Sequence, residues 1–362
     1  MVKRRALLTG LGLTGLAAAA AEKAAPPSFT VAGGPRKSTS GLPPRKVIVG
    51  TAMQPFWGPY PGLEKRLEEL AAIVDRMARE SKSRYGRSLD LAILPETAIT
   101  GEAGGDALSR SVAFEGPVAN TFARTAREHR CYVIVPTYLR ESHDPKRCSN
   151  AAVLVDRTGE VAGTYRKMHL VVSGDGKTME GGSSPGKELP VFNCDFGKLG
   201  IQICYDMEFD GGWRELARQG AELIAWPTQS PQTCQPAARA SERRCYIVSS
   251  TWRHNASVFE PTGKILAQIK PPGQVLVQEL DLSYAILPWS SKLRHGKALQ
   301  EMFGEKIGFR YYEDEDSGIF WSNDPSMPVR QMVQALGVLE AEDELARVRE
   351  SYRKASVPLY RS

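Results

Sequence analysis

Residues 200–206 read Gly-Ile-Gln-Ile-Cys-Tyr-Asp, an apolar run that ends in a thiol and an abrupt polar break. The run predicts a strand that delivers Cys204 to its end, a position suited to a nucleophile. Two further segments have the same design. Residues 91–96, Leu-Ala-Ile-Leu-Pro-Glu, form an apolar stretch that ends in the carboxylate of Glu96, and residues 165–170, Tyr-Arg-Lys-Met-His-Leu, place the ammonium of Lys167 in a short strand-like stretch. A base, a cation and a thiol together suffice for covalent acyl transfer.

Strand-like and helix-like patterns alternate on both sides of this run, from about residue 46 to residue 282. The predicted strands cover 47–52, 90–94, 131–136, 151–155, 161–165, 200–204, 222–226, 245–250, 257–259, 265–270 and 274–282. The predicted helices cover 62–80, 117–129, 211–219 and 235–244, the first with a continuous apolar face. Alternation with intervening hairpins predicts an α/β fold of two mixed sheets covered by helices.

The N-terminus has the pattern of a targeting segment. Basic residues 3–5 precede a mildly apolar, Gly-containing stretch, and small residues near 21–25 offer cleavage sites. This arrangement is typical of a signal peptide, and the paired arginines Arg4 and Arg5 favour the twin-arginine route to a periplasmic or secreted location. The alternative is an uncleaved amphiphilic tail. After signal removal we expect no membrane-spanning segment.

The remaining organisation follows from composition. Residues 26–44 are rich in Pro, Ser, Gly and Lys without periodicity and are predicted to be a linker. The main domain is expected over 45–284. Residues 285–362 form a C-terminal extension that contains an acidic loop at 313–316 and a final helix at about 340–354, which would pack on the domain or on a partner subunit.

The overall composition excludes several classes of function. The chain has 362 residues, 42% hydrophobic and 24% charged, with a formal net charge of +6, and a protein of this length can bury a sizeable core. No basic stripe with interleaved aromatic residues occurs, so nucleic acid is not an expected partner. The six cysteines form no close CxxC pair, which argues against a zinc ribbon or a thioredoxin-like redox site.

The three segments that end in Glu96, Lys167 and Cys204 occur in the order of the motifs of the nitrilase superfamily, the carbon–nitrogen hydrolases. Over roughly residues 46–282 the chain resembles this family, and in particular its amidase and carbamylase branch. Residues 214–224 and 240–246 resemble supporting segments of the family. The resemblance implies a four-layer α-β-β-α sandwich of two mixed sheets flanked by helices, with 45–284 as the carbon–nitrogen hydrolase domain.

Amide hydrolysis then assigns a role to each group. Cys204 is expected to be the nucleophile, Glu96 its general base, and Lys167 a fixed positive charge at the carbonyl oxygen, with the backbone N–H of Tyr205 as second oxyanion donor. The resemblance also implies a second active-site glutamate before a Pro-Gly. Glu180 fits that place and would orient Lys167 or the substrate, the alternative being a solvent-facing loop acid. Asp206 is expected to bond the local backbone, and His169 to pack or to make a hydrogen bond. No metal or organic cofactor is expected.

The leading hypothesis is an exported hydrolase that cleaves a small amide or an N-carbamoyl compound with water through a thioester. The sequence Cys-Tyr-Asp differs from the Cys-Trp-Glu of nitrilases proper, which disfavours nitriles as substrates. One alternative is an acyltransferase on the same scaffold, and another is a non-catalytic binding or assembly module. The resemblance further implies a homodimer or a higher homo-oligomer.

Overall fold

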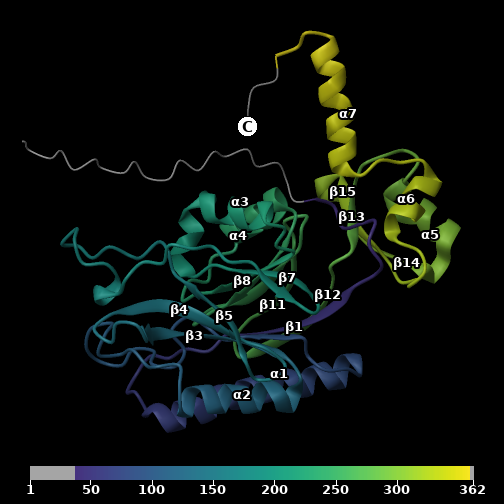
Figure 1. The fold of residues 1–362 in the computed structure, drawn as a ribbon. Helices are drawn as coiled ribbons and strands as arrows, with labels where there is room; N and C mark the ends of the chain where they lie inside the picture. The colour runs from purple at the N-terminus through teal and green to yellow at the C-terminus, as the bar shows by residue number, and fades with distance from the viewer. Residues whose placement is uncertain (1–36, 359–362) are drawn as a thin grey trace, which may run out of the picture. The chain divides into compact units, whose positions relative to one another are not determined.

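Two six-stranded sheets form the centre of the protein in the computed structural model, which describes residues 37–358 (Figure 1). The first sheet has the order β12 (Val275–Asp281), β1 (Lys46–Ala52), β2 (Leu91–Ile93), β3 (Tyr132–Arg140), β4 (Cys148–Val155), β5 (Val161–Arg166). The second has the order β11 (Ile265–Ile269), β10 (Ala256–Phe259), β9 (Tyr246–Ser250), β8 (Leu223–Pro227), β7 (Gly197–Ile201), β6 (Phe192–Cys194). Each sheet combines a parallel centre with antiparallel neighbours, so the predicted pair of mixed sheets is confirmed.

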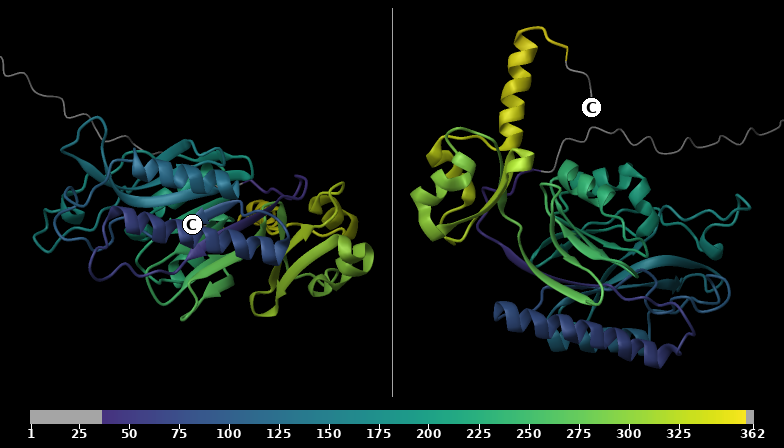
Figure 2. Two further views of the ribbon diagram at one scale, coloured as in Figure 1. Left: turned by 90° about the horizontal axis from the view of Figure 1, so that it is seen from below. Right: turned by 180° about the vertical axis from the view of Figure 1, so that it is seen from behind.

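Helices cover the outer face of each sheet (Figures 1 and 2). The first sheet carries α1 (Leu63–Tyr85) and α2 (Pro117–His129), and the second carries α3 (Asp210–Arg218) and α4 (Cys234–Arg243). Alternate residues of one strand serve two interfaces, because successive side chains point to opposite faces. Val47 and Val49 join the cluster between the sheets, whereas Ile48 packs under the helices. The predicted four-layer α-β-β-α sandwich is therefore confirmed.

The longest helix, α1, packs closely on β1. Its buried side chains include Leu70, Val74 and Met77. A Cβ atom at Gly50 of β1 would lie 2.9 Å from the Met77 sulfur, so only glycine allows this approach. The helix ends at Tyr85, and the next residue, Gly86, adopts the left-handed conformation and donates its N–H to Lys82 O. The predicted helix 62–80 therefore extends five residues further.

The C-terminal extension contains a third sheet that the sequence reading did not anticipate. Its antiparallel order is β13 (Tyr284–Pro288), β15 (Ser317–Ser322), β14 (Ile307–Tyr312), and it is covered by α5 (Lys297–Phe303) and α6 (Val329–Leu336). Arg310 joins this sheet to the main domain through an ion pair of 2.9 Å with Glu260, which is fully buried. The predicted final helix is confirmed as α7 (Ala341–Lys354), which has no buried residue.

The predicted signal peptide, residues 1–25, lies outside the described residues, as does the first part of the predicted linker. Within the described part of that linker, the Ser38 hydroxyl donates to Glu340 at 2.7 Å and the Ser40 hydroxyl donates to the same carboxylate at 2.5 Å. Thr39 Oγ1 donates to Leu282 O at 2.7 Å. Ser38 and Ser40 are thus attached to the C-terminal extension, and Thr39 is attached to the end of the main domain. Within residues 37–358, none of the helices has both the length and the apolar character needed to cross a membrane.

Candidate active site

The thiol of Cys204 lies just beyond a strand of the second sheet. Strand β7 ends at Ile201, three residues earlier than the predicted strand, and Cys204 begins a 3₁₀ turn (Cys204–Glu208). Its φ of 43° is in the left-handed region, which is rare for a residue with a side chain. The sharp turn separates the thiol from the regular ladder of the sheet.

The buried carboxylate of Asp206 holds this turn in place. One of its oxygens accepts hydrogen bonds from Ile203 N at 2.9 Å and from the Tyr165 hydroxyl at 2.7 Å. The other oxygen lies 2.9 Å from His169 N and 2.8 Å from His169 Nδ1. Asp206 therefore ties the cysteine turn to the segment that carries Lys167. The expected bond of Asp206 to its local backbone is confirmed at Ile203, and the hydrogen bond expected of His169 is made to Asp206.

Glu96 lies in the turn that follows β2, and only 2% of the residue is exposed. Its backbone carbonyl accepts a hydrogen bond from Trp252 Nε1 at 2.8 Å. Its Oε2 accepts the backbone N–H of Gln229 at 3.2 Å. The Trp252 indole thus holds the backbone of Glu96, and the Gln229 amide orients its carboxylate. Both donors follow strands of the second sheet.

Lys167 directly follows β5, the edge strand of the first sheet, and 1% of the residue is exposed. Its Nζ lies 3.0 Å from Glu96 Oε1 and 2.9 Å from Glu180 Oε2. Burial opposes the charge, but the two glutamates and the Cys204 sulfur outweigh this effect and raise the pKa of Lys167 well above its usual value. Lys167 therefore remains an ammonium ion.

Glu180 belongs to the same cluster. It begins a 3₁₀ turn (Glu180–Gly182), and its side chain is 11% exposed, so it points into the cluster and away from solvent. Burial, together with the negative charge of Glu96, raises the pKa of Glu180 although Lys167 opposes the shift. Glu180 is therefore in direct contact with Lys167, and its role in orienting Lys167 or the substrate stays a prediction.

Asn150 on β4 is a member of the cluster that the sequence reading missed. It is fully buried, and its Nδ2 donates to Glu96 Oε1 at 2.8 Å and to Glu180 Oε1 at 2.5 Å. Its backbone oxygen accepts the N–H of Lys167 at 2.8 Å. The sequence offers one signal for this residue. Asparagine is depleted in strands, yet Asn150 directly precedes the apolar run 151–155 of a predicted strand.

The Cys204 thiol lies within the electrostatic reach of this cluster. Burial, and next the negative charge of Glu96, raise the pKa of the thiol to about 12, and Lys167 and hydrogen bonds with Thr228 and the Gln229 backbone only partly oppose the shift. The thiol is therefore protonated at neutral pH. Attack on a substrate requires a base to remove the proton during the reaction.

Tyr205 follows Cys204 in the turn, and 40% of the residue is exposed. The ring lies at 77° to that of Phe209, with centroids 5.7 Å apart, and Phe209 in turn stacks on His169. The role of the Tyr205 N–H as an oxyanion donor stays a prediction. Among residues 37–358 no group of three or more His, Cys, Asp and Glu side chains is arranged to hold a metal ion.

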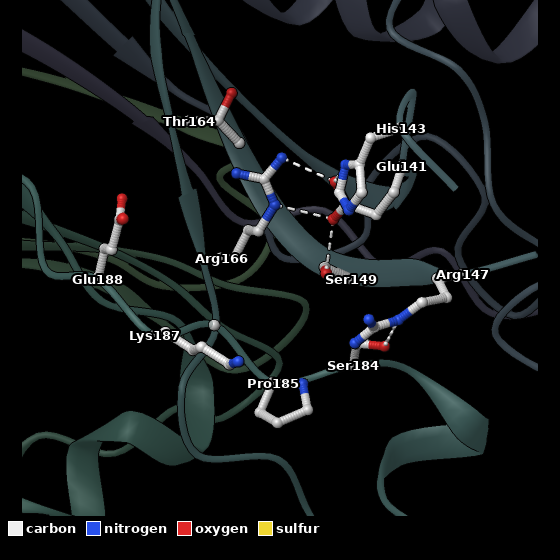
Figure 3. A pocket seen from close by; sticks show the side chains of 11 residues that line it. Glu141, His143, Arg147, Ser149, Thr164, Arg166, Ser184, Pro185, Lys187 and Glu188 are labelled. Atoms are coloured by element: carbon white, nitrogen blue, oxygen red, sulfur yellow. Dashed lines mark hydrogen bonds and ion pairs between the residues drawn. The ribbon is translucent and has the colours of Figure 1, made fainter. Parts of the chain in front are cut away.

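A separate hollow of about 290 Å³ is lined by other side chains (Figure 3). Its walls include Arg166 and Ser149, which are the chain neighbours of Lys167 and Asn150. Because successive side chains of a strand alternate, Arg166 and Ser149 point to the face of the sheet opposite to Lys167 and Asn150. Glu141 accepts two hydrogen bonds of 2.8 Å from Arg166 and one of 2.7 Å from the Ser149 hydroxyl. This hollow is lined by a closed ion pair and does not include Glu96 or Cys204.

Comparisons with known proteins show which proteins this chain is similar to. A family model described as carbon-nitrogen hydrolase matches residues 52–287. Deaminated glutathione amidase of Homo sapiens is 29% identical over 195 residues, which cover 47% of this chain and 59% of that protein. The omega-amidase NIT2 of Danio rerio is 24% identical over 225 residues, which cover 56% of this chain and 80% of that protein. The chain thus spans less than two thirds of the length of the human relative.

Solved structures show the same fold. Nit3 of Saccharomyces cerevisiae, described as a member of branch 10 of the nitrilase superfamily, has a TM-score of 0.56 at 20% identity, covering 66% of this chain and 90% of that chain. A mutant amidase of Nesterenkonia from the nitrilase superfamily has a TM-score of 0.55 at 22% identity, covering 66% of this chain and 93% of that chain.

Proposed function

The chain belongs to the carbon–nitrogen hydrolase family of the nitrilase superfamily, and from this premise we propose that it is an amidohydrolase with Cys204 as nucleophile. The observation that carries the proposal is the buried cluster in which Lys167 Nζ lies 3.0 Å from Glu96 Oε1, within electrostatic reach of the thiol. The proposed substrate is a small amide or an N-carbamoyl compound. Relatives whose names describe amidases support an amide.

The proposed reaction begins with attack by Cys204 Sγ on the carbonyl carbon, while Glu96 accepts the thiol proton. The C–N bond then breaks, Glu96 gives the proton to the leaving nitrogen, and ammonia or an amine departs. A thioester joins the acyl carbon to Sγ. Water attacks this carbon and passes a proton to Glu96, the C–S bond breaks, and the returning proton restores the thiol.

Lys167 is proposed to stabilise the oxyanion. An ammonium group has three N–H donors. Two of them are accounted for by Glu96 and Glu180, which leaves one for the carbonyl oxygen of the substrate. The Tyr205 N–H is the proposed second donor, and one donor of this kind contributes about 3 kcal/mol to lowering the barrier.

A panel of small amides, N-carbamoyl compounds and nitriles, assayed for ammonia release, tests this function. We expect release from at least one amide or carbamoyl compound and none from nitriles. Cys204→Ala should abolish the release, because no other group in the cluster can form the thioester. Release that persists in Cys204→Ala, or a chain that turns over only nitriles, would contradict the proposal.

We also propose that the enzyme is exported through the twin-arginine route and acts in the periplasm or outside the cell as a homodimer or higher homo-oligomer. The motif around Arg4 and Arg5 supports the first part. The exposed side chains of Leu345 and Tyr352 on α7 support the second. Replacing both arginines by lysine should retain the protein in the cytoplasm. Light scattering that gives a monomer at micromolar concentration would contradict the oligomer.

A further inference from the structure

The amide of Asn150 connects the two carboxylates of the cluster. Its two N–H hydrogens go to different acids, with Nδ2 at 2.8 Å from Glu96 Oε1 and 2.5 Å from Glu180 Oε1. Asn150 Oδ1 is buried without a hydrogen-bond partner among the described residues. An unpaired buried acceptor is costly. The reverse orientation of the amide would set this oxygen against two carboxylate oxygens, so the two acids determine which way the amide points.

The backbone holds Asn150 in this position. Strand β4 lies between β3 and β5, where Asn150 is paired with Tyr138, and its carbonyl accepts the N–H of Lys167 at 2.8 Å. The side chain is fully buried. The amide therefore adds two hydrogen bonds to carboxylates without adding a formal charge, in contrast to Lys167, which bridges the same two acids.

The two oxygens of Glu96 have different surroundings as a result. Glu96 Oε1 accepts from Asn150 and lies 3.0 Å from Lys167 Nζ, so its two lone pairs are occupied. Glu96 Oε2 accepts only the Gln229 N–H, at 3.2 Å, among the described residues. The Gln229 backbone also helps to lower the pKa of the Cys204 thiol, against the larger effect of burial. Oε2 is therefore the oxygen with a lone pair left, and it is bonded to the backbone amide that also acts on the nucleophile.

We propose that Asn150 is a positioning residue that saturates Glu96 Oε1, leaves Oε2 to accept the thiol proton, and fixes Glu180 at the same time. This inference rests on the proposed function. It assigns a direction to the proton transfer: the Cys204 S–H bond breaks, the proton moves to Oε2, and the sulfur lone pair forms the bond to the acyl carbon. Asn150 itself contacts neither the substrate nor the proton in transit.

Two variants of Asn150 and one matched control test the inference. Asn150→Ala removes both donors, and Asn150→Asp keeps the shape but places a third carboxylate beside Glu96 and Glu180. The control is Ser149→Ala, which removes a buried hydrogen bond to a carboxylate from the same strand on its opposite face. We expect kcat to fall by roughly 100-fold in Asn150→Ala with KM within about 3-fold of the unmodified value, and Ser149→Ala to keep its kcat.

The pH profile distinguishes positioning from simple support of the fold. In Asn150→Asp the acid limb of the kcat profile should move to higher pH, because a third carboxylate makes the cluster around Glu180 hold a proton more tightly. A folded Asn150→Ala or Asn150→Asp variant with unmodified kcat and pH profile would overturn the inference. If Asn150→Ala does not fold, the isosteric Asn150→Asp carries the test.

Alkylation of Cys204 by iodoacetamide at pH 7.5 gives a readout that does not depend on the substrate. Asn150→Ala should react roughly 10-fold more slowly than the unmodified chain, because a misplaced Glu96 is a poorer acceptor for the thiol proton. Equal rates would overturn the role of Asn150. No turnover in the unmodified chain, together with the expected slowing, would refute the proposed function and leave the positioning role intact.

Discussion

Removing one charge from the buried cluster should cost different amounts of stability, depending on which charge is removed. Glu96 and Glu180 carry two negative charges around the single positive charge of Lys167, at 3.0 and 2.9 Å. Glu96→Gln leaves one ion pair intact. Lys167→Met leaves two buried carboxylates facing each other without a cation between them. The two variants thus separate the loss of chemistry from the loss of structure.

The expected magnitudes follow from these contacts. In Glu96→Gln the side-chain oxygen can still accept from Asn150, and the main loss is the acceptor for Gln229 N–H, at a cost of about 1–2 kcal/mol in unfolding free energy. In Lys167→Met an uncompensated buried charge remains, at a cost of about 3–5 kcal/mol. Turnover should fall by roughly 100- to 10,000-fold in Glu96→Gln, because general-base catalysis is lost.

Urea unfolding at pH 8, followed by tryptophan fluorescence, gives the stability difference, and ammonia release gives kcat. Glu96→Gln should unfold at a higher urea concentration than Lys167→Met while being inactive. Glu96→Asp, which keeps the charge but shortens the side chain, is the matched control and should retain more activity than the glutamine variant. Retained turnover in Glu96→Gln, or a Lys167→Met variant as stable as the unmodified chain, would refute the electrostatic reasoning.

Three further outcomes follow from contacts outside the reacting groups. Asp206→Asn should lower the unfolding free energy by about 3 kcal/mol, measured by urea titration, because a donor replaces an oxygen that accepts two buried hydrogen bonds; equal stability would contradict its role in the turn. Glu340→Ala should lower the unfolding free energy by about 1–2 kcal/mol, because Ser38 and Ser40 lose their acceptor. The chain near Lys37 should then be cleaved by trypsin under native conditions, and unchanged cleavage would contradict the tether. Burial raises the pKa of Asp281 to about 6, although Lys46 opposes the shift, so the contribution of Asp281 to stability is present below about pH 4 and is lost as pH rises through 6. Asp281→Asn should remove up to about 3 kcal/mol of this decline in unfolding free energy between pH 4 and pH 7, and a variant with the same pH profile of stability would contradict the assignment.

The main domain could be predicted from local patterns because most of its strands and helices are buried on a periodic face. The helix at 117–129 was predicted with the bounds of α2, since Pro117 and His129 stand at its two ends. The strand through Cys204 was predicted three residues too long. Ile203 continues the apolar pattern but leaves the ladder, because the carboxylate of Asp206 accepts its N–H. The Gln202 N–H still donates to Ala225 O of β8 at 3.0 Å.

The C-terminal sheet escaped prediction for a different reason. Strand β14 is only partly buried along most of its length, and its hairpin to β15 contains the acidic residues 313–316, so the segment has a polar composition. Asn150 escaped because a side chain that satisfies partners distant in sequence has no local signal. Its two acids are 54 and 30 residues away along the chain. The Glu96, Lys167 and Cys204 motifs were recognisable as a set, because all three occur in the order of the family. The residue that connects Glu96 and Glu180 could be found only in the three-dimensional structure.

The left-handed backbone of Cys204 has an evolutionary consequence. A residue with a Cβ atom is disfavoured at a φ of 43°, by about 1 kcal/mol relative to glycine. Selection for folding alone would therefore favour Cys204→Gly, which cannot form a thioester. If this lineage ceased to need its chemistry, drift toward glycine at this position would be an early sign, and a descendant that kept the thiol would indicate that catalysis is still under selection.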